Sequence, residues 1–224
     1  MASTPKPLKV LFHLHPRLDT LDFAGPLEVL SQAIYPSTRS LPTPVRVFEP
    51  TVTAVTEQVT SGQKCIFQRH VSLEEAYSRL TEFDVLVIPG GGTDGVLNAK
   101  SEPLDLIRSW CALEKEEGRT RILLSICTGS LLLAQAGALK GLTATTHPHY
   151  YARFREMCEG LATVVEERYV VNKVSEKGLR VITSGGVSCG LDACMWLIND
   201  VAGKQCVDEV LEVVQYSWRQ GVVI

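Results

Sequence analysis

The segment Arg121-Ile-Leu-Leu-Ser-Ile-Cys-Thr-Gly-Ser-Leu-Leu-Leu-Ala134 decides the fold. Its first part, 121–126, is an almost continuous apolar run of strand length, and 129–136 predicts a helix that Gly137 can end. A strand buried on both faces and followed at once by a helix is typical of α/β proteins with a parallel sheet. Cys127 stands at the turn between the two elements.

The same alternation of strand and helix continues in both directions from this segment. Apolar runs predict strands at 10–15, 45–48, 83–88 and 179–184, and helical spacing predicts helices from near Asp22 to Ile34 and at 72–80, 104–117, 150–158, 191–201 and 206–219. We also expect a loop at 35–44, a polar region at 51–62 that can hold a hairpin, and a hairpin-like pair around 164 and 169–174. The chain therefore predicts one α/β domain over 1–224, with helices on both faces of a mainly parallel sheet and a loose tail at 1–8.

Composition narrows the classes of function. The chain has 224 residues, of which 45% are hydrophobic and 21% charged, as in a compact globular domain. With a formal net charge of -3, it has no electrostatic reason to bind nucleic acid or an anionic membrane, and it has no apolar run of membrane-spanning length. We expect a cytoplasmic protein that binds a small-molecule substrate. The seven cysteines lack close pairs, which indicates reduced thiols.

Cys127 is the candidate nucleophile. A side chain on a tight turn between strand and helix projects into the cleft at the carboxyl ends of the strands, where α/β proteins bind ligands. The helix N-terminus behind the turn favours a thiolate, so we expect the cysteine pKa to fall below its usual value of about 8.5. Small residues at Gly129 and Ser130 let the helix begin close to the strand. The alternative is that Cys127 is one more small buried residue.

Two further segments are predicted to meet Cys127 at this edge of the sheet. The glycines after Ile88, among them Gly90 and Gly91, and the Thr128 N–H are expected to present donors to developing negative charge, although a plain turn is the alternative. Beyond the first strand, a carboxyl beside the cysteine would serve as acid and base. Spacing alone does not choose among Asp19, Asp22 and Glu28, and Asp22 can equally serve as the N-cap of the helix that it begins.

The histidines do not complete a metal site. His13 and His15 share one strand face, as do His147 and His149, but no cysteine or acid stands at ligand spacing from either pair. We therefore expect no bound metal.

Together, three blocks resemble the DJ-1/PfpI superfamily. They are Leu21-Asp-Phe-Ala-Gly-Pro-Leu-Glu28, then Asp84-Val-Leu-Val-Ile-Pro-Gly-Gly91, and Ile126-Cys-Thr-Gly-Ser-Leu131 with 144–148 and 181–184 downstream. Within it, Cys-Thr-Gly-Ser and Leu-Asp-Phe-Ala-Gly-Pro are similar to the isonitrile hydratase branch. The resemblance implies a flavodoxin-like sandwich, a homodimer, and hydration of an isonitrile to an N-substituted formamide without a cofactor.

The resemblance also implies roles for individual residues. It makes Cys127 the nucleophile, Asp22 its acidic partner, Thr128 a hydroxyl neighbour and Gly91 a backbone donor. His147 lies in a segment that also resembles DJ-1, which makes it a candidate for contact with the pocket. The protease-like and glyoxalase-like branches place a histidine directly after the cysteine, whereas this chain has Thr128, which weakens a peptidase interpretation.

Two other functions remain open at this point. A glyoxalase or deglycase would act on reactive carbonyls through the same cysteine. A redox or ligand sensor would use the same pocket without turnover, as in the sensor half of some AraC-type regulators. The present chain is not expected to have room for the DNA-binding half of such a regulator.

Overall fold

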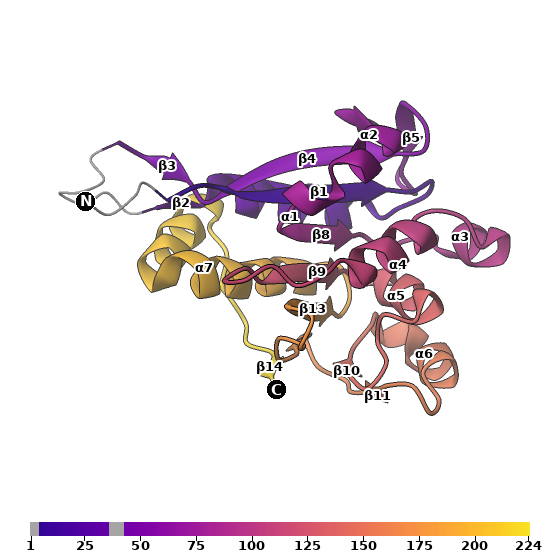
Figure 1. The fold of residues 1–224 in the computed structure, drawn as a ribbon. Helices are drawn as coiled ribbons and strands as arrows, with labels where there is room; N and C mark the ends of the chain where they lie inside the picture. Colours follow the sequence, from indigo (N-terminus) through magenta and orange to yellow (C-terminus); the bar gives the residue numbers. More distant parts are fainter. Residues whose placement is uncertain (1–4, 36–42) are drawn as a thin grey trace.

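The computed structural model describes residues 5–35 and 43–224, and the main feature of this part is an eight-stranded sheet (Figure 1). Its strands lie in the order β14 (Val222–Val223), β12 (Tyr169–Val171), β13 (Leu179–Ser184), β9 (Arg121–Ser125), β8 (Val85–Ile88), β1 (Leu8–Leu14), β4 (Phe48–Ala54) and β7 (Val71–Ser72). Neighbours run parallel except β12 and β13, which are antiparallel. The predicted α/β fold with a mainly parallel sheet is confirmed.

Helices cover both faces of this sheet (Figure 1). Helices α1 (Thr20–Gln32) and α7 (Cys189–Val214) pack on one face, and α2 (Leu73–Ser78), α4 (Leu104–Ala112) and α5 (Gly129–Ala136) on the other. The remaining elements are α3 (Asp94–Ala99), α6 (Tyr151–Met157), the 3-10 turns η1 (Leu80–Glu82) and η2 (Pro148–Tyr150), and the short strands β2 (Ile34–Tyr35), β3 (Val45–Arg46), β5 (Gln58–Thr60), β6 (Ile66–Gln68), β10 (Thr143–Ala144) and β11 (Thr163–Val164).

Two apolar layers hold the helices to the sheet. Phe12 of β1 meets Phe23 of α1 edge to face, with ring centroids 5.5 Å apart, in the first layer. Trp110 of α4 is fully buried in the second. Each such side chain contributes about 1.5–3 kcal/mol by leaving water, so the central strands and their helices form a rigid base for the loops at their carboxyl ends.

The prediction for 51–62 was partly wrong. Residues 51–54 belong to β4, which pairs along its whole length with β1, and only β5 and β6 form a hairpin. The threonines of 51–54 led to the prediction of a polar region instead of a strand. Thr53 is nevertheless fully buried, and its hydroxyl donates to Val71 O at 3.3 Å, so hydrogen bonding offsets the burial of a polar side chain.

Other boundaries also differ from the prediction. Strand β1 begins at Leu8, within the predicted tail, and α4 ends at Ala112 instead of extending to 117. The expected hairpin around 164 and 169–174 does not form, because β11 pairs with β10 while β12 pairs with β13 and β14. The two predicted C-terminal helices form α7, with a non-helical Gly203 between them, and α7 ends at Val214. The predicted loop at 35–44 lies largely outside the described residues.

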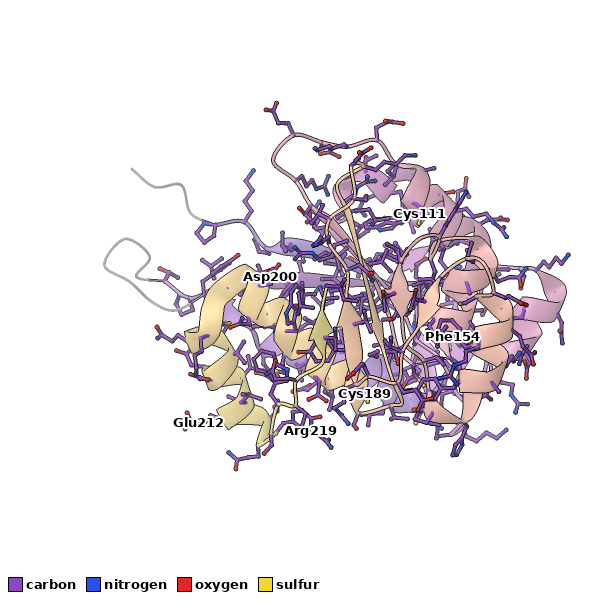
Figure 2. All side chains as sticks on the ribbon, turned by 90° about the horizontal axis from the view of Figure 1, so that it is seen from below. Cys111, Phe154, Cys189, Asp200, Glu212 and Arg219 are labelled. Atoms are coloured by element: carbon purple, nitrogen blue, oxygen red, sulfur yellow. The ribbon has the colours of Figure 1, made fainter. Side chains whose placement is uncertain are left out.

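An ion pair with a buried carboxylate lies at the start of α7, and the same carboxylate holds the C-terminal segment. Asp192 is fully buried, and Arg168 Nε donates to its Oδ2 at 2.6 Å. The Arg219 N–H donates to Asp192 Oδ1 at 2.9 Å, and Figure 2 shows Arg219 on the same side of the molecule as Cys189. This contact brings the residues after α7 back to the edge of the sheet, where β14 pairs with β12.

In the part of the chain that the structure describes, none of the helices combines the length and apolar character needed to cross a bilayer.

Candidate active site

A cavity of about 330 Å³ lies at the carboxyl ends of β1, β8 and β9. The three predicted segments meet there, because each follows one of these adjacent parallel strands. Its lining consists of Arg17, Asp19, Gly62, Gln63, Gly91, Gly92, Cys127, Thr128, His147, Tyr150 and Val187.

The turn that carries Cys127 has the strained geometry of a nucleophile elbow. Cys127 has a φ of 89°, in the left-handed region that a residue with a side chain rarely adopts. Two hydroxyl groups hold its carbonyl oxygen, Ser130 Oγ at 3.0 Å and Thr146 Oγ1 at 2.9 Å. A Cβ at position 129 would lie 2.5 Å from Ile88 O, so the close approach of helix and strand requires Gly129, as predicted.

The three candidate carboxylates have different surroundings. Asp19, and not Asp22, is the N-cap of α1 and accepts from the Leu21 N–H at 3.1 Å. Glu28 is exposed and accepts from Gln32 Nε2 at 2.8 Å. Asp22 is fully buried in the first turn of α1, close enough to Cys127 for each group to shift the pKa of the other. The structure therefore brings Asp22 together with the cysteine.

Asp22 has one oxygen held and one oxygen free. Its Oδ2 accepts from the Gly90 N–H at 3.1 Å, while Oδ1 has no hydrogen-bond partner among the described residues. Burial raises the pKa of Asp22 to about 7, and the charge of Asp19 adds to the rise. Interaction with Cys127 and the Gly90 N–H opposes it. The carboxyl therefore changes its protonation state near neutral pH.

The expected fall in the pKa of Cys127 was wrong. The residue is only 4% exposed, and burial, followed by the charge of Asp22, raises the pKa of the thiol well above its usual range. The backbone N–H groups of Val187 and Thr128 oppose this rise. Loss of water around the sulfur outweighs the favourable helix N-terminus. Above neutral pH, the pair therefore holds its proton on sulfur and its charge on the carboxylate.

The backbone N–H groups available to stabilise negative charge differ from those predicted. The Gly91 N–H donates to Thr128 Oγ1 at 2.8 Å, and the same hydroxyl donates to Gly91 O at 2.9 Å. The Gly90 N–H is occupied by Asp22, so neither glycine N–H is free for a substrate. The Thr128 and Val187 N–H groups are the backbone donors that act on the sulfur.

Val187 was missed by the sequence analysis. It belongs to the turn Ser184-Gly-Gly-Val187, which follows β13, the parallel neighbour of β9. A glycine pair directly after a buried strand was the available signal, because this turn reaches the same edge of the sheet as the cysteine turn.

His147, the candidate for contact with the pocket, is among the residues that line the cavity. Its Nδ1 accepts from the His149 N–H at 3.2 Å. Partial burial and then the neighbouring His149 lower the pKa of His147, so the ring is neutral near pH 7 and carries its proton on Nε2. Arg17, Gln63 and Tyr150 also line the cavity and were not predicted.

Within 5–35 and 43–224, no three His, Cys, Asp or Glu side chains form a group that could hold a metal ion.

Gly91 provides a test of the loop geometry. Its φ is 106°, and a Cβ there would lie 2.2 Å from the Asp19 backbone nitrogen. Gly91→Ala should therefore lower the free energy of unfolding by about 3 kcal/mol, as measured by thermal and urea unfolding. The matched control is Gly95→Ala in α3, where a Cβ meets open space and should be neutral or stabilising by up to about 1 kcal/mol. Equal stabilities of the Gly91 variant and the unmodified protein would contradict this loop geometry.

Comparison with known proteins shows the family of this chain. Residues 8–199 match the model of the DJ-1/PfpI family. The chain belongs to the DJ-1/PfpI family. Isonitrile hydratase of Pseudomonas putida is 30% identical over 210 residues, which cover 94% of this chain and 79% of the relative. DJ-1alpha of Drosophila melanogaster is 25% identical over 166 residues, 73% of this chain and 68% of the relative.

The solved structures agree on the fold. A ThiJ/PfpI family protein from Pseudomonas syringae superimposes with a TM-score of 0.71 and 23% identity, covering 96% of this chain and 77% of that one. The DJ-1/PfpI architecture, a mainly parallel sheet between helices, is thus the flavodoxin-like arrangement expected from the sequence.

Proposed function

We propose that this DJ-1/PfpI protein adds water to an isonitrile and releases an N-substituted formamide. The observation that carries the proposal is the buried carboxyl of Asp22 behind Cys127, whose side chain lines a cavity large enough for a small substrate. The similarity to isonitrile hydratase supports the same chemistry. The residue after the cysteine is Thr128 and not a histidine, so no imidazole stands there to accept a proton. We therefore assign the proton transfers to Asp22.

In the first step, sulfur and a proton add to the same carbon of the isonitrile. The Asp22 carboxylate takes the thiol proton as the sulfur bonds to the terminal carbon, and the carboxylic acid then gives that proton to the carbon. The product is a thioimidate, in which nitrogen is doubly bonded to a CH group that carries the sulfur. The free Oδ1 of Asp22 is available for this transfer, while Oδ2 stays fixed by the Gly90 N–H.

In the second step, water adds to the thioimidate carbon, and one of its protons reaches the nitrogen. The hydroxyl proton of the resulting adduct returns through Asp22 to the sulfur as the carbon–sulfur bond breaks. The Thr128 and Val187 N–H groups stabilise negative charge on the departing sulfur. Formamide leaves, and the thiol is restored.

The test is an assay of the purified protein with cyclohexyl isocyanide and, separately, methylglyoxal. We expect N-cyclohexylformamide and no lactate. Lactate without formamide would contradict the proposal and favour a glyoxalase. No turnover of either compound, together with oxidation of Cys127 to a sulfinic acid, would contradict it and favour a sensor. Cys65→Ser is the matched control, because Cys65 is exposed and does not line the cavity.

A further inference from the structure

Arg17 lies at the rim of the cavity with its backbone held on both sides. Its N–H donates to Thr60 O at 2.9 Å, and its carbonyl accepts from the Gly92 N–H at 2.8 Å. Its φ of 64° lies in the left-handed region. Because these contacts fix the main chain, the side chain begins from a defined position beside the cavity.

The Arg17 side chain is directed across Gly92. A Cβ at position 92 would lie 2.9 Å from Arg17 Cβ and 3.2 Å from its Nε. None of the ion pairs found between residues of the described ranges involves Arg17. Within those ranges, the guanidinium is therefore a cation without a carboxylate partner at the edge of the site that contains Cys127.

His147 adds a second donor to this rim. Because its Nδ1 accepts from the His149 N–H, the neutral ring has its proton on Nε2. The ring packs against Gly186, where a Cβ would lie 3.1 Å from Nε2, so its orientation is constrained. Both His147 and the phenol-bearing Tyr150 line the cavity.

Asp19, the one acidic side chain among the described residues that line this cavity, is already occupied. Its Oδ1 accepts from the Leu21 N–H at 3.1 Å, and its Oδ2 accepts from Gln63 Nε2 at 2.9 Å. The carboxylate also caps the N-terminus of α1, which stabilises its charged form. The hydrogen-bonding capacity left at the rim is thus mainly that of donors, and it suits an anionic ligand.

We propose that Arg17 and His147 bind a carboxylate on the non-reacting end of the substrate, so that small acidic isonitriles are the preferred substrates. The substrate class rests on the proposed function, whereas anion binding at this rim is independent of it. A guanidinium binds a carboxylate through two parallel hydrogen bonds. The free energy of a hydrogen bond to a charged group corresponds to about a tenfold or larger preference for an acidic ligand over its neutral analogue.

The first experiment measures anion preference without isonitrile turnover. The rates at which iodoacetate and iodoacetamide alkylate Cys127 are compared by peptide mass spectrometry, with exposed Cys65 in the same protein as the reference. We expect Arg17→Gln to lower the iodoacetate-to-iodoacetamide ratio at Cys127 about tenfold, with Arg17→Lys intermediate. Arg108→Gln should leave the ratio unchanged, because Arg108 lies on α4 and pairs with Asp105. Equal ratios in Arg17→Gln and the unmodified protein would overturn the proposal.

The second experiment compares isocyanoacetate with its methyl ester, which carries the same isonitrile without the charge. We expect kcat/KM to be about tenfold higher for the acid, and Arg17→Gln to remove that difference. Hydration of both at equal rates would overturn the inference and leave the proposed function standing. If neither is hydrated while cyclohexyl isocyanide is, the preference for acidic isonitriles is overturned and the proposed function stands. If all three are inert, the proposed function fails, and the alkylation ratio still decides whether the rim binds anions.

Discussion

Cys127→Ser is expected to lower the rate of formamide formation by about 10³-fold or more, because the proposed mechanism passes through a bond to sulfur. A hydroxyl loses its proton far less readily than a thiol, and the buried site disfavours the anion further. Serine keeps nearly the same size, and position 127 keeps its backbone contacts through the carbonyl oxygen. The fold should therefore survive the change.

The measurement is a single-turnover and steady-state assay with cyclohexyl isocyanide, accompanied by circular dichroism to check the fold. In the unmodified protein, rapid mixing and acid quenching should trap a mass increase on the peptide that contains Cys127, corresponding to one substrate molecule. Cys194→Ser is the control for loss of a buried thiol. Cys194 is fully buried in α7 and does not line the cavity, so its replacement should lower stability more than it lowers turnover. Substantial formamide production by the Cys127 variant would remove the thioimidate from the mechanism.

Asp22→Asn is expected to lower kcat/KM by about 10²–10⁴-fold, the usual contribution of a positioned acid and base. An amide can still accept from the Gly90 N–H, so the turn should stay in place, but it cannot take up the thiol proton. Glu28→Gln is the matched control, because Glu28 is an exposed carboxylate on the same helix. Nearly full activity in Asp22→Asn would show that protons move by another route.

The pH dependence provides a second measurement on Asp22. The pKa of about 7 means that the carboxylate able to accept the thiol proton forms as the pH rises through neutrality. The value of kcat/KM in the unmodified protein should therefore increase from acidic pH to about pH 8, with an apparent pKa of about 7, and this limb should vanish in Asp22→Asn. A profile that falls across this range would contradict the assignment of Asp22 as the base.

Ionisation of Asp22, which should raise kcat/KM as the pH increases, should lower the stability of the folded protein over the same range. Because the folded state raises the pKa of Asp22, its contribution to stability is fully present below the unfolded value of about 3.9 and is lost as the pH rises through about 7. The amide of the Asp22→Asn variant does not ionise, so this variant should gain stability relative to the unmodified protein as the pH increases from about 4 to 8, as followed by urea unfolding. Glu28→Gln should show no such trend. These opposite effects on activity and stability separate a functional carboxyl from a structural one.

Most of the fold could be predicted from short stretches of sequence. The apolar runs at 83–88 and 121–126 are buried strands because side chains on both faces of a central parallel strand meet helices. The turn at Cys127 was predictable for a similar reason, since Gly129 permits contact with Ile88 O that a larger residue would prevent. Strand β4 was harder, because its threonines are buried through hydrogen bonds that local polarity does not reveal.

The site was predictable in outline but not in its electrostatics. The motifs placed Cys127, the glycines and a group of three carboxylates at one edge of the sheet, yet they did not separate Asp22 from Asp19 and Glu28 without the family resemblance. The Gly91 N–H is occupied by Thr128, and Val187 contributes a donor that the sequence analysis did not consider. The rim formed by Arg17 and His147 likewise joins segments that are distant in the chain.

By itself, the sequence determined the order of strands and helices, the parallel sheet and the position of the reactive turn, because these follow from the periodicity and size of neighbouring side chains. Only the tertiary structure decided which carboxyl meets the sulfur, where their shared proton resides and which donors remain free. Protonation depends on the water that a group loses and the charges that it gains when remote segments come together, and none of these quantities is a property of local sequence.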